Sequence, residues 1–196
     1  MLRAVEFSHQ LLRERLFPGD MAIDATAGNG QDTHFLARLT GPDGMVFAFD
    51  VQDEAIAATR SLLERRGVPA ESWQLIHAGH ETMAEAIPRR WHGHAGAVLF
   101  NLGYLPGSDK TITTTAASTV AAMRAALDLV RPGGAIIAVL YTGHPGGAEE
   151  SAAVLDFAAG LATRDYHAVE YRTINFCNSP PSVLAIEKCG TAWEPE

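Results

Sequence analysis

The stretch MAIDATAGNGQDTHFLARLTGPDGMVFAFD, residues 21–50, decides the fold. It opens with a short apolar run ending in Asp24, continues through Gly28 and Gly30, and closes with a second apolar run ending in Asp50. This spacing predicts a strand, a tight loop, a helix and a second strand. Glycines let the backbone approach a ligand, a helix start offers unpaired N–H groups, and an acid after the second strand suits ribose hydroxyls. The stretch therefore predicts a site for a nucleoside cofactor.

The sequence of this site is compatible with two cofactors, a dinucleotide and S-adenosylmethionine. The dinucleotide fingerprint has a third glycine where this chain has Thr33. Asp24 and Asp32 flank the loop, and carboxylates repel a diphosphate but attract an ammonium and a sulfonium group. A tight turn without any ligand would also explain the glycine pair, but the acid after the second apolar run argues against it. We therefore expect S-adenosylmethionine.

The rest of the chain alternates between apolar runs and helical patterns, which predicts an α/β fold. Such alternation gives a mostly parallel sheet with helices on both faces. The loop before the last strand is short enough to join only antiparallel neighbours. We therefore expect one domain, residues 1–196, with a seven-stranded, mostly parallel sheet and an antiparallel last strand. The expected strands cover residues 21–23, 45–49, 73–77, 96–100, 135–140, 166–175 and 183–187.

The expected helices are an N-terminal helix over residues 1–17, one directly after the glycine loop, and four more. These four cover residues 54–66, 82–87, 115–130 and 148–162. Asp53 is the expected N-cap of the first of them. Because ligands bind at the carboxyl ends of parallel strands, the side chains at those ends should converge on one edge. They are Asp24, Asp50, His80, Asn101 and Tyr141.

Composition restricts the partners of the chain. The 196 residues carry a formal net charge of −8, which argues against tight sequence-independent binding to RNA phosphates. Several arginines and Lys110 would supply a local basic patch, although an ordinary solvated surface is the simpler interpretation. Neither a membrane-spanning run nor a signal peptide is expected, and two cysteines form no disulfide framework. We expect a cytoplasmic protein without a metal site or membrane partner, and the sequence is compatible with a homodimer.

Three stretches together resemble one protein family. The glycine loop and Asp50 resemble the first motif and ribose-binding acid of class I S-adenosylmethionine-dependent methyltransferases, and residues 129–134 resemble the turn before their fifth strand. Residues 24–33, 49–52 and 101–110 are similar, more narrowly, to the bacterial MnmM/YtqB group, whose members have been labelled rRNA methylases. Members with an assigned activity methylate 5-aminomethyl-2-thiouridine at the tRNA wobble position. The resemblance implies a Rossmann-like fold, S-adenosylmethionine as cofactor and tRNA as substrate.

The resemblance also implies which residues bind the cofactor. They are Asn29, Gln31, Asp32, Asp50, Gln52 and His80, which line the expected pocket. The expected cofactor-binding set also includes Asp24, Gly28, Thr33 and Asn101.

The loop after the fourth strand is the expected catalytic segment. Base-amine methyltransferases often carry Asn-Pro-Pro-Tyr here, and this chain has Asn101, Leu102, Gly103 and Tyr104. The Asn101 side chain and the Leu102 carbonyl would accept hydrogen bonds from the target amine, while Tyr104 would stack on the base. A structural interpretation, in which Asn101 caps a turn and Tyr104 fills the core, stays open.

A general base is optional for this chemistry. If one acts, the candidates are Tyr104, Asp109 and His144, the last of which follows the fifth strand. A loop histidine that only makes a hydrogen bond would look the same in sequence.

The sequence is compatible with three functions. The first is methylation of the aminomethyl group of the tRNA wobble uridine, and the second is methylation of rRNA or of a small-molecule amine. The third, from another class, is a non-catalytic nucleotide-binding or NAD-dependent Rossmann protein.

Overall fold

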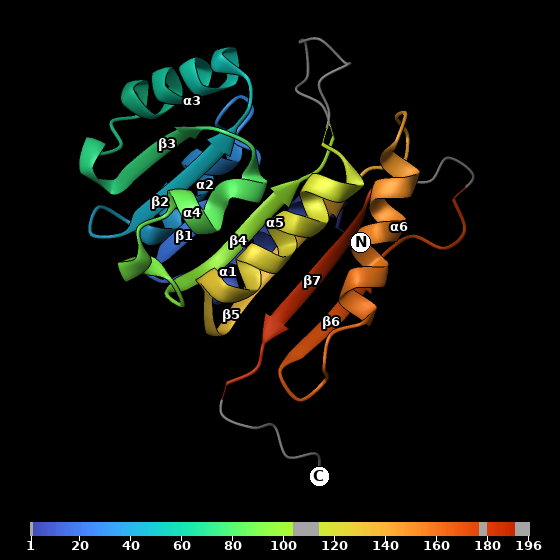
Figure 1. Cartoon of the computed structure of the whole chain (residues 1–196). Helices are drawn as coiled ribbons and strands as arrows, with labels where there is room; N and C mark the ends of the chain where they lie inside the picture. The colour runs from blue at the N-terminus through green and yellow to red at the C-terminus, as the bar shows by residue number, and fades with distance from the viewer. Residues whose placement is uncertain (1, 104–113, 177–179, 191–196) are drawn as a thin grey trace.

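A single seven-stranded sheet forms the centre of the molecule (Figure 1). The structure is a computed structural model that describes residues 2–103, 114–176 and 180–190. The strand order is β3-β2-β1-β4-β5-β7-β6. Strands β1 to β5 pair in parallel, and β7 is antiparallel to both of its neighbours, as expected. The strands are β1 (Met21–Asp24), β2 (Met45–Asp50), β3 (Trp73–His77), β4 (Ala95–Asn101), β5 (Val130–Leu140), β6 (Tyr166–Tyr171) and β7 (Ser182–Lys188).

Helices cover both faces of the sheet (Figure 1). Neighbouring residues of a strand point to opposite faces, so Met21 and Ile23 enter one core cluster and Ala22 enters the other. The first cluster lies under α4, α5 and α6, and the second lies under α1 and α2, with α3 beside α2. The helices are α1 (Ala4–Arg15), α2 (Gln31–Thr40), α3 (Asp53–Arg65), α4 (Met83–Ala86), α5 (Ala116–Leu129) and α6 (Gly147–Ala159).

Strand β5 begins at Val130, earlier than the expected start at Ala135. Val130 pairs with Ala95 and Ala135 pairs with Ala97, so the residues between them bulge out of the register. Gly133 has a left-handed φ of 75° within this bulge. The expected turn is therefore present, but it lies inside the strand instead of before it.

Three other boundaries differ from the expectation. The N-cap of α3 is Gln52 and makes no side-chain cap hydrogen bond; Asp53 is instead the first helical residue. The segment after β3 begins as a 3-10 turn at His80 before α4 starts. Strand β6 ends at Tyr171, short of the expected residue 175.

Within the part of the chain that the structure describes, no helix is long and apolar enough to cross a membrane.

Candidate active site

A cavity of about 610 Å³ opens at the carboxyl edge of the parallel strands. Its volume is in the range of small-molecule and cofactor sites. The loops after β1, β2, β3, β4 and β5 all contribute to its wall. The lining residues are 25–29, 31–32, 50–52, 78–81 and 101–103, together with Thr114, Ser118, Tyr141, Gly143 and His144.

The glycine loop between β1 and α2 is held closely against α3. Gly28 and Gly30 have left-handed φ values of 54° and 78°, which glycine adopts without strain. A Cβ on Gly30 would lie 2.8 Å from the Cα of Thr59, and the Thr59 hydroxyl donates to the Gly28 carbonyl over 3.1 Å. Any larger residue at position 30 would therefore push the loop and α3 apart.

Asp24 and Thr33 support this loop from beneath and do not line the cavity. Both side chains are fully buried, and the Thr33 hydroxyl donates to Asp24 Oδ2 over 2.6 Å. The Thr26 N–H donates to the other carboxyl oxygen over 3.1 Å. Burial, reinforced by the charges of Asp32 and Asp50, raises the pKa of Asp24 to about 7. The structure therefore places both residues beneath the loop, outside the lining of the cavity.

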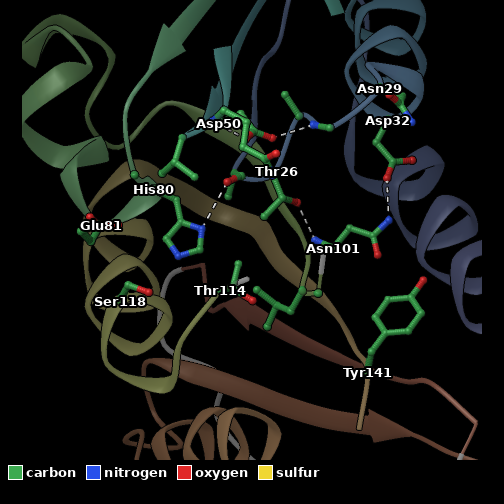
Figure 2. Close-up of a pocket in the computed structure, with 18 of the residues that line it drawn as sticks. Thr26, Asn29, Asp32, Asp50, His80, Glu81, Asn101, Thr114, Ser118 and Tyr141 are labelled. Atoms are coloured by element: carbon green, nitrogen blue, oxygen red, sulfur yellow. Dashed lines mark hydrogen bonds between the residues drawn. The ribbon is translucent and has the colours of Figure 1, made fainter. Parts of the chain in front are cut away.

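Asp50 links the end of β2 to the glycine loop (Figure 2). Its Oδ2 accepts from the Gly28 N–H over 2.9 Å, and its Oδ1 accepts from the Gln52 N–H over 2.9 Å. A carboxylate has about four lone-pair sites, so Asp50 can still accept hydrogen bonds from the hydroxyls of a ribose.

Asn101 is held by both its main chain and its side chain (Figure 2). Its backbone N–H donates to the Thr26 hydroxyl over 2.8 Å, and its Nδ2 donates to Asp32 Oδ2 over 3.1 Å. The amide oxygen remains as the acceptor end of the side chain. The next residue, Leu102, donates its N–H to the Val139 carbonyl over 3.0 Å and buries its side chain.

His80 and Tyr141 contribute neutral polar groups to the wall. The His80 Nδ1 lies 3.2 Å from the Ala25 carbonyl, so this nitrogen carries the proton and Nε2 is an acceptor. Burial lowers the pKa of His80. Burial, with the negative charge of Asp32, raises the pKa of Tyr141.

The structure brings most of the predicted site residues together. Those that line the cavity are Gly28, Asn29, Gln31, Asp32, Asp50, Gln52, His80, Asn101, Leu102 and His144. Tyr104 and Asp109 lie outside the described residues. Thr114 and Ser118, at the start of α5, also line the cavity, although nothing in the local sequence distinguishes them from ordinary helix-start residues.

The charge of the wall decides between the two cofactors. Asp32, Asp50 and Glu81 line the cavity, whereas no lysine or arginine does so among the described residues. Carboxylates attract a cationic ligand and repel a diphosphate. Together with the parallel sheet, the glycine loop and the acid ending β2, this wall fits S-adenosylmethionine. The fold and the site define a class I S-adenosylmethionine-dependent methyltransferase.

Comparison with known proteins gives the family. Residues 46–187 match the family model described as "Putative rRNA methylase", and the chain belongs to this family. The chain is 36% identical over 193 residues to the chloroplastic tRNA (mnm(5)s(2)U34)-methyltransferase of Arabidopsis thaliana. That alignment covers 95% of this chain and 70% of the plant protein.

Solved structures agree with this assignment. A crystal structure from Clostridium thermocellum, described as a "putative rRNA-methylase", has a TM-score of 0.91 and 38% identity, covering 96% of this chain and 98% of its own. The Streptococcus mutans protein SMU.1697c, solved in complex with SAH, has a TM-score of 0.86 and 36% identity. That alignment covers 96% of this chain and 99% of the other. The expected fold, cofactor and enzyme class are confirmed.

Proposed function

We propose that the enzyme methylates the aminomethyl group of 5-aminomethyl-(2-thio)uridine at the tRNA wobble position, giving 5-methylaminomethyl-(2-thio)uridine. The observation that carries this proposal is the amide of Asn101, whose donor end is taken by Asp32 and whose acceptor end lies at the wall of the cavity. An amine with N–H donors is the group that such an acceptor orients. The name of the 36% identical plant relative supports the tRNA substrate.

The residues of the chain act mainly by orientation. S-adenosylmethionine supplies the electrophilic methyl group on its sulfonium. The Asn101 amide oxygen and the Leu102 carbonyl would accept the N–H groups of the target amine and so orient its lone pair. Removal from water lowers the pKa of an alkylamine and so releases that lone pair. Holding both reactants in a fixed mutual orientation would contribute to the acceleration.

A base would take the proton that the amine loses. His144 is the candidate within the described residues: it lines the cavity, and its Nδ1 lies 3.0 Å from the Pro145 carbonyl. Tyr104 and Asp109 keep their proposed roles. Tyr104 would stack on the target nucleobase, and both residues are alternative candidates for the general base.

Ribosomal RNA is the second candidate substrate, because the family description names it. Both candidates would bring a target group to the Asn101 acceptor, but the nucleotide and the RNA that carries it differ. We place the reaction in the cytoplasm, where the two cysteines of the chain would stay reduced.

Nucleoside analysis tests the proposal. Purified protein and S-adenosylmethionine are incubated with tRNA carrying 5-aminomethyl-2-thiouridine, and digested nucleosides are measured by mass spectrometry. We expect a gain of one methyl group on that nucleoside, and no gain with ribosomal RNA. Methylation of ribosomal RNA with unchanged tRNA would replace the first candidate by the second.

A further inference from the structure

Three side chains from separate elements form a continuous hydrogen-bonded series that ends at the site. His9 of α1 places its Nε2 2.7 Å from Oδ1 of Asp32, the second residue of α2. The other oxygen of Asp32 accepts from the Nδ2 of Asn101, at the end of β4, over 3.1 Å. Figure 2 shows Asp32 above the Asn101 amide, with Tyr141 on the other side. His9 is not among the residues that line the cavity.

Asp32 decides which end of the Asn101 amide is available. An amide carries a donor end and an acceptor end of almost the same shape, and a carboxylate only accepts. A rotated Asn101 would place its oxygen against Oδ2 of Asp32, and the two acceptors would repel each other. The carboxylate therefore holds the NH₂ group and leaves the oxygen for a ligand.

His9 in turn decides how Asp32 is held. Because its Nε2 faces a carboxylate oxygen, this nitrogen carries the proton and donates it. The imidazole also stacks on Phe35 of α2, with ring centroids 3.9 Å apart and planes 10° apart. The Arg13 guanidinium lies 5.0 Å from the centroid of the same phenyl ring. Stacking restricts the plane of the imidazole, and within that plane Nε2 lies toward Oδ1 of Asp32.

The hydrogen bond between His9 and Asp32 is largely shielded from water, which strengthens it. The side chains of His9 and Asp32 are 23% and 13% exposed, so water competes little for the bond. Hydrogen bonds with a charged partner are roughly twice as strong as neutral ones. The N-terminal helix therefore holds Asp32 through a hydrogen bond, in addition to covering the sheet.

We propose that His9 is a positioning residue for methyl transfer: through Asp32 it fixes the Asn101 amide with its oxygen toward the target amine. The part of the proposal that concerns the amine rests on the proposed function. The orientation of the amide does not, because it is a property of the protein alone.

Two substitutions at one position separate the hydrogen bond from the packing. His9→Phe keeps a ring to stack on Phe35 but removes the donor. His9→Gln removes the stacking but places an amide N–H close to the position of Nε2. His92→Phe is the matched control, because His92 is a partly buried histidine that bonds the Ile87 carbonyl and does not line the cavity.

The first readout is nuclear magnetic resonance of the protein without substrate. The chain has four asparagines, so the side-chain NH₂ signals of a protein labelled at asparagine are easily assigned. In the wild type, the Asn101 NH₂ should exchange slowly and show a single conformer. We expect faster exchange or a second conformer in His9→Phe, recovery in His9→Gln, and no change in His92→Phe.

The second readout is steady-state kinetics with the tRNA substrate. We expect His9→Phe to lower kcat by about tenfold, the size of one charge-assisted hydrogen bond, while the Kd for S-adenosylmethionine changes by less than about threefold. His9→Gln should recover most of kcat although it lacks the stacking. An unchanged Asn101 signal in His9→Phe, or equal losses in His9→Phe and His9→Gln, would overturn the proposal. If the wild-type protein methylates no tRNA, the proposed function is refuted. The nuclear magnetic resonance result would then still test whether His9 orients the Asn101 amide.

Discussion

Asn101 and Asp50 line the same cavity, yet their bonds predict different losses on substitution. Asn101→Ala removes the acceptor for the amine but no expected ribose contact, so kcat should fall by about 100-fold or more. Asp50→Ala removes both the expected ribose acceptor and the carboxylate that accepts from the Gly28 N–H, so it should weaken cofactor binding by about 10- to 100-fold. Calorimetry with S-adenosylmethionine and single-turnover kinetics measure the two effects separately.

The comparison is informative only if the variants fold. Circular dichroism and the unfolding midpoint should stay close to the wild type for Asn101→Ala. Equal losses of cofactor affinity in both variants would contradict the division between an amine-orienting and a cofactor-binding residue.

Asp24 predicts a pH dependence of stability. Its folded-state pKa of about 7 lies above the ordinary 3.8, so the folded protein keeps a proton that the unfolded chain has released. The stability contributed by this proton is complete below about pH 4 and is lost as the pH rises through about 7. An asparagine side chain at this position would imitate the protonated carboxyl at every pH. We expect Asp24→Asn to gain on the order of 2 kcal/mol relative to the wild type between about pH 5 and about pH 8, measured by urea unfolding.

The control for this prediction is Asp20→Asn. Asp20 pairs with Arg131 over 3.2 Å outside the cavity, so its substitution should not produce a gain toward alkaline pH. A wild type and Asp24→Asn whose stabilities differ by the same amount at both pH values would contradict the raised pKa.

At the scale of elements, α6 anchors the start of α5 through one buried carboxylate. Glu150 is 2% exposed, and its two oxygens accept from the hydroxyls of Thr114 and Thr119 over 2.8 Å and 2.5 Å. Thr114 lines the cavity. Glu150→Ala leaves both hydroxyls without this acceptor and creates a void, so it should cost about 2–4 kcal/mol of unfolding free energy. Chemical denaturation measures this loss.

The neighbouring Glu149 provides the comparison, since it is exposed on the same helix. Glu149→Ala should change stability by less than about 0.5 kcal/mol. A small effect at both positions would show that α6 does not anchor α5 through Glu150.

The elements that the sequence predicts well are those whose signal is local. Strands β1, β2 and β4 are recognisable because an apolar run stops at Asp24, Asp50 or Asn101. The start of β5 is not recognisable from the sequence, because Pro132 and Gly133 have the local pattern of a turn. In the structure, pairing of Val130 with Ala95 turns this segment into a bulge within the strand. Pairing across the sheet is a tertiary effect that no local pattern contains.

Prediction of the candidate site from sequence is limited in the same way, because tertiary packing decides which side chains reach the cavity. The spacing of Asp24 and Asp32 around the glycine loop indicates two carboxylates near a ligand, but only Asp32 lines the cavity. Which side of a strand end a side chain takes depends on what packs beneath it, here Thr33. The role of His9 is equally hidden, because its partner lies 23 residues away on another helix.

At the scale of the whole molecule, the cofactor should stabilise the fold by mass action. A ligand that binds only the folded state, at a concentration of about a hundred times its Kd, adds about 2.7 kcal/mol of stability. For a chain of this length that corresponds to a rise of about 5–10 °C in the unfolding midpoint. Since carboxylates line the cavity and Asp50 ends β2, the rise should occur with S-adenosylmethionine and not with NAD. Differential scanning fluorimetry of the wild type with each ligand measures it, and Asp50→Ala at the same ligand concentration should show a smaller rise. A midpoint raised by NAD alone would mean that the acidic wall does not select the cationic methyl donor, and the methyltransferase mechanism built on it would fail.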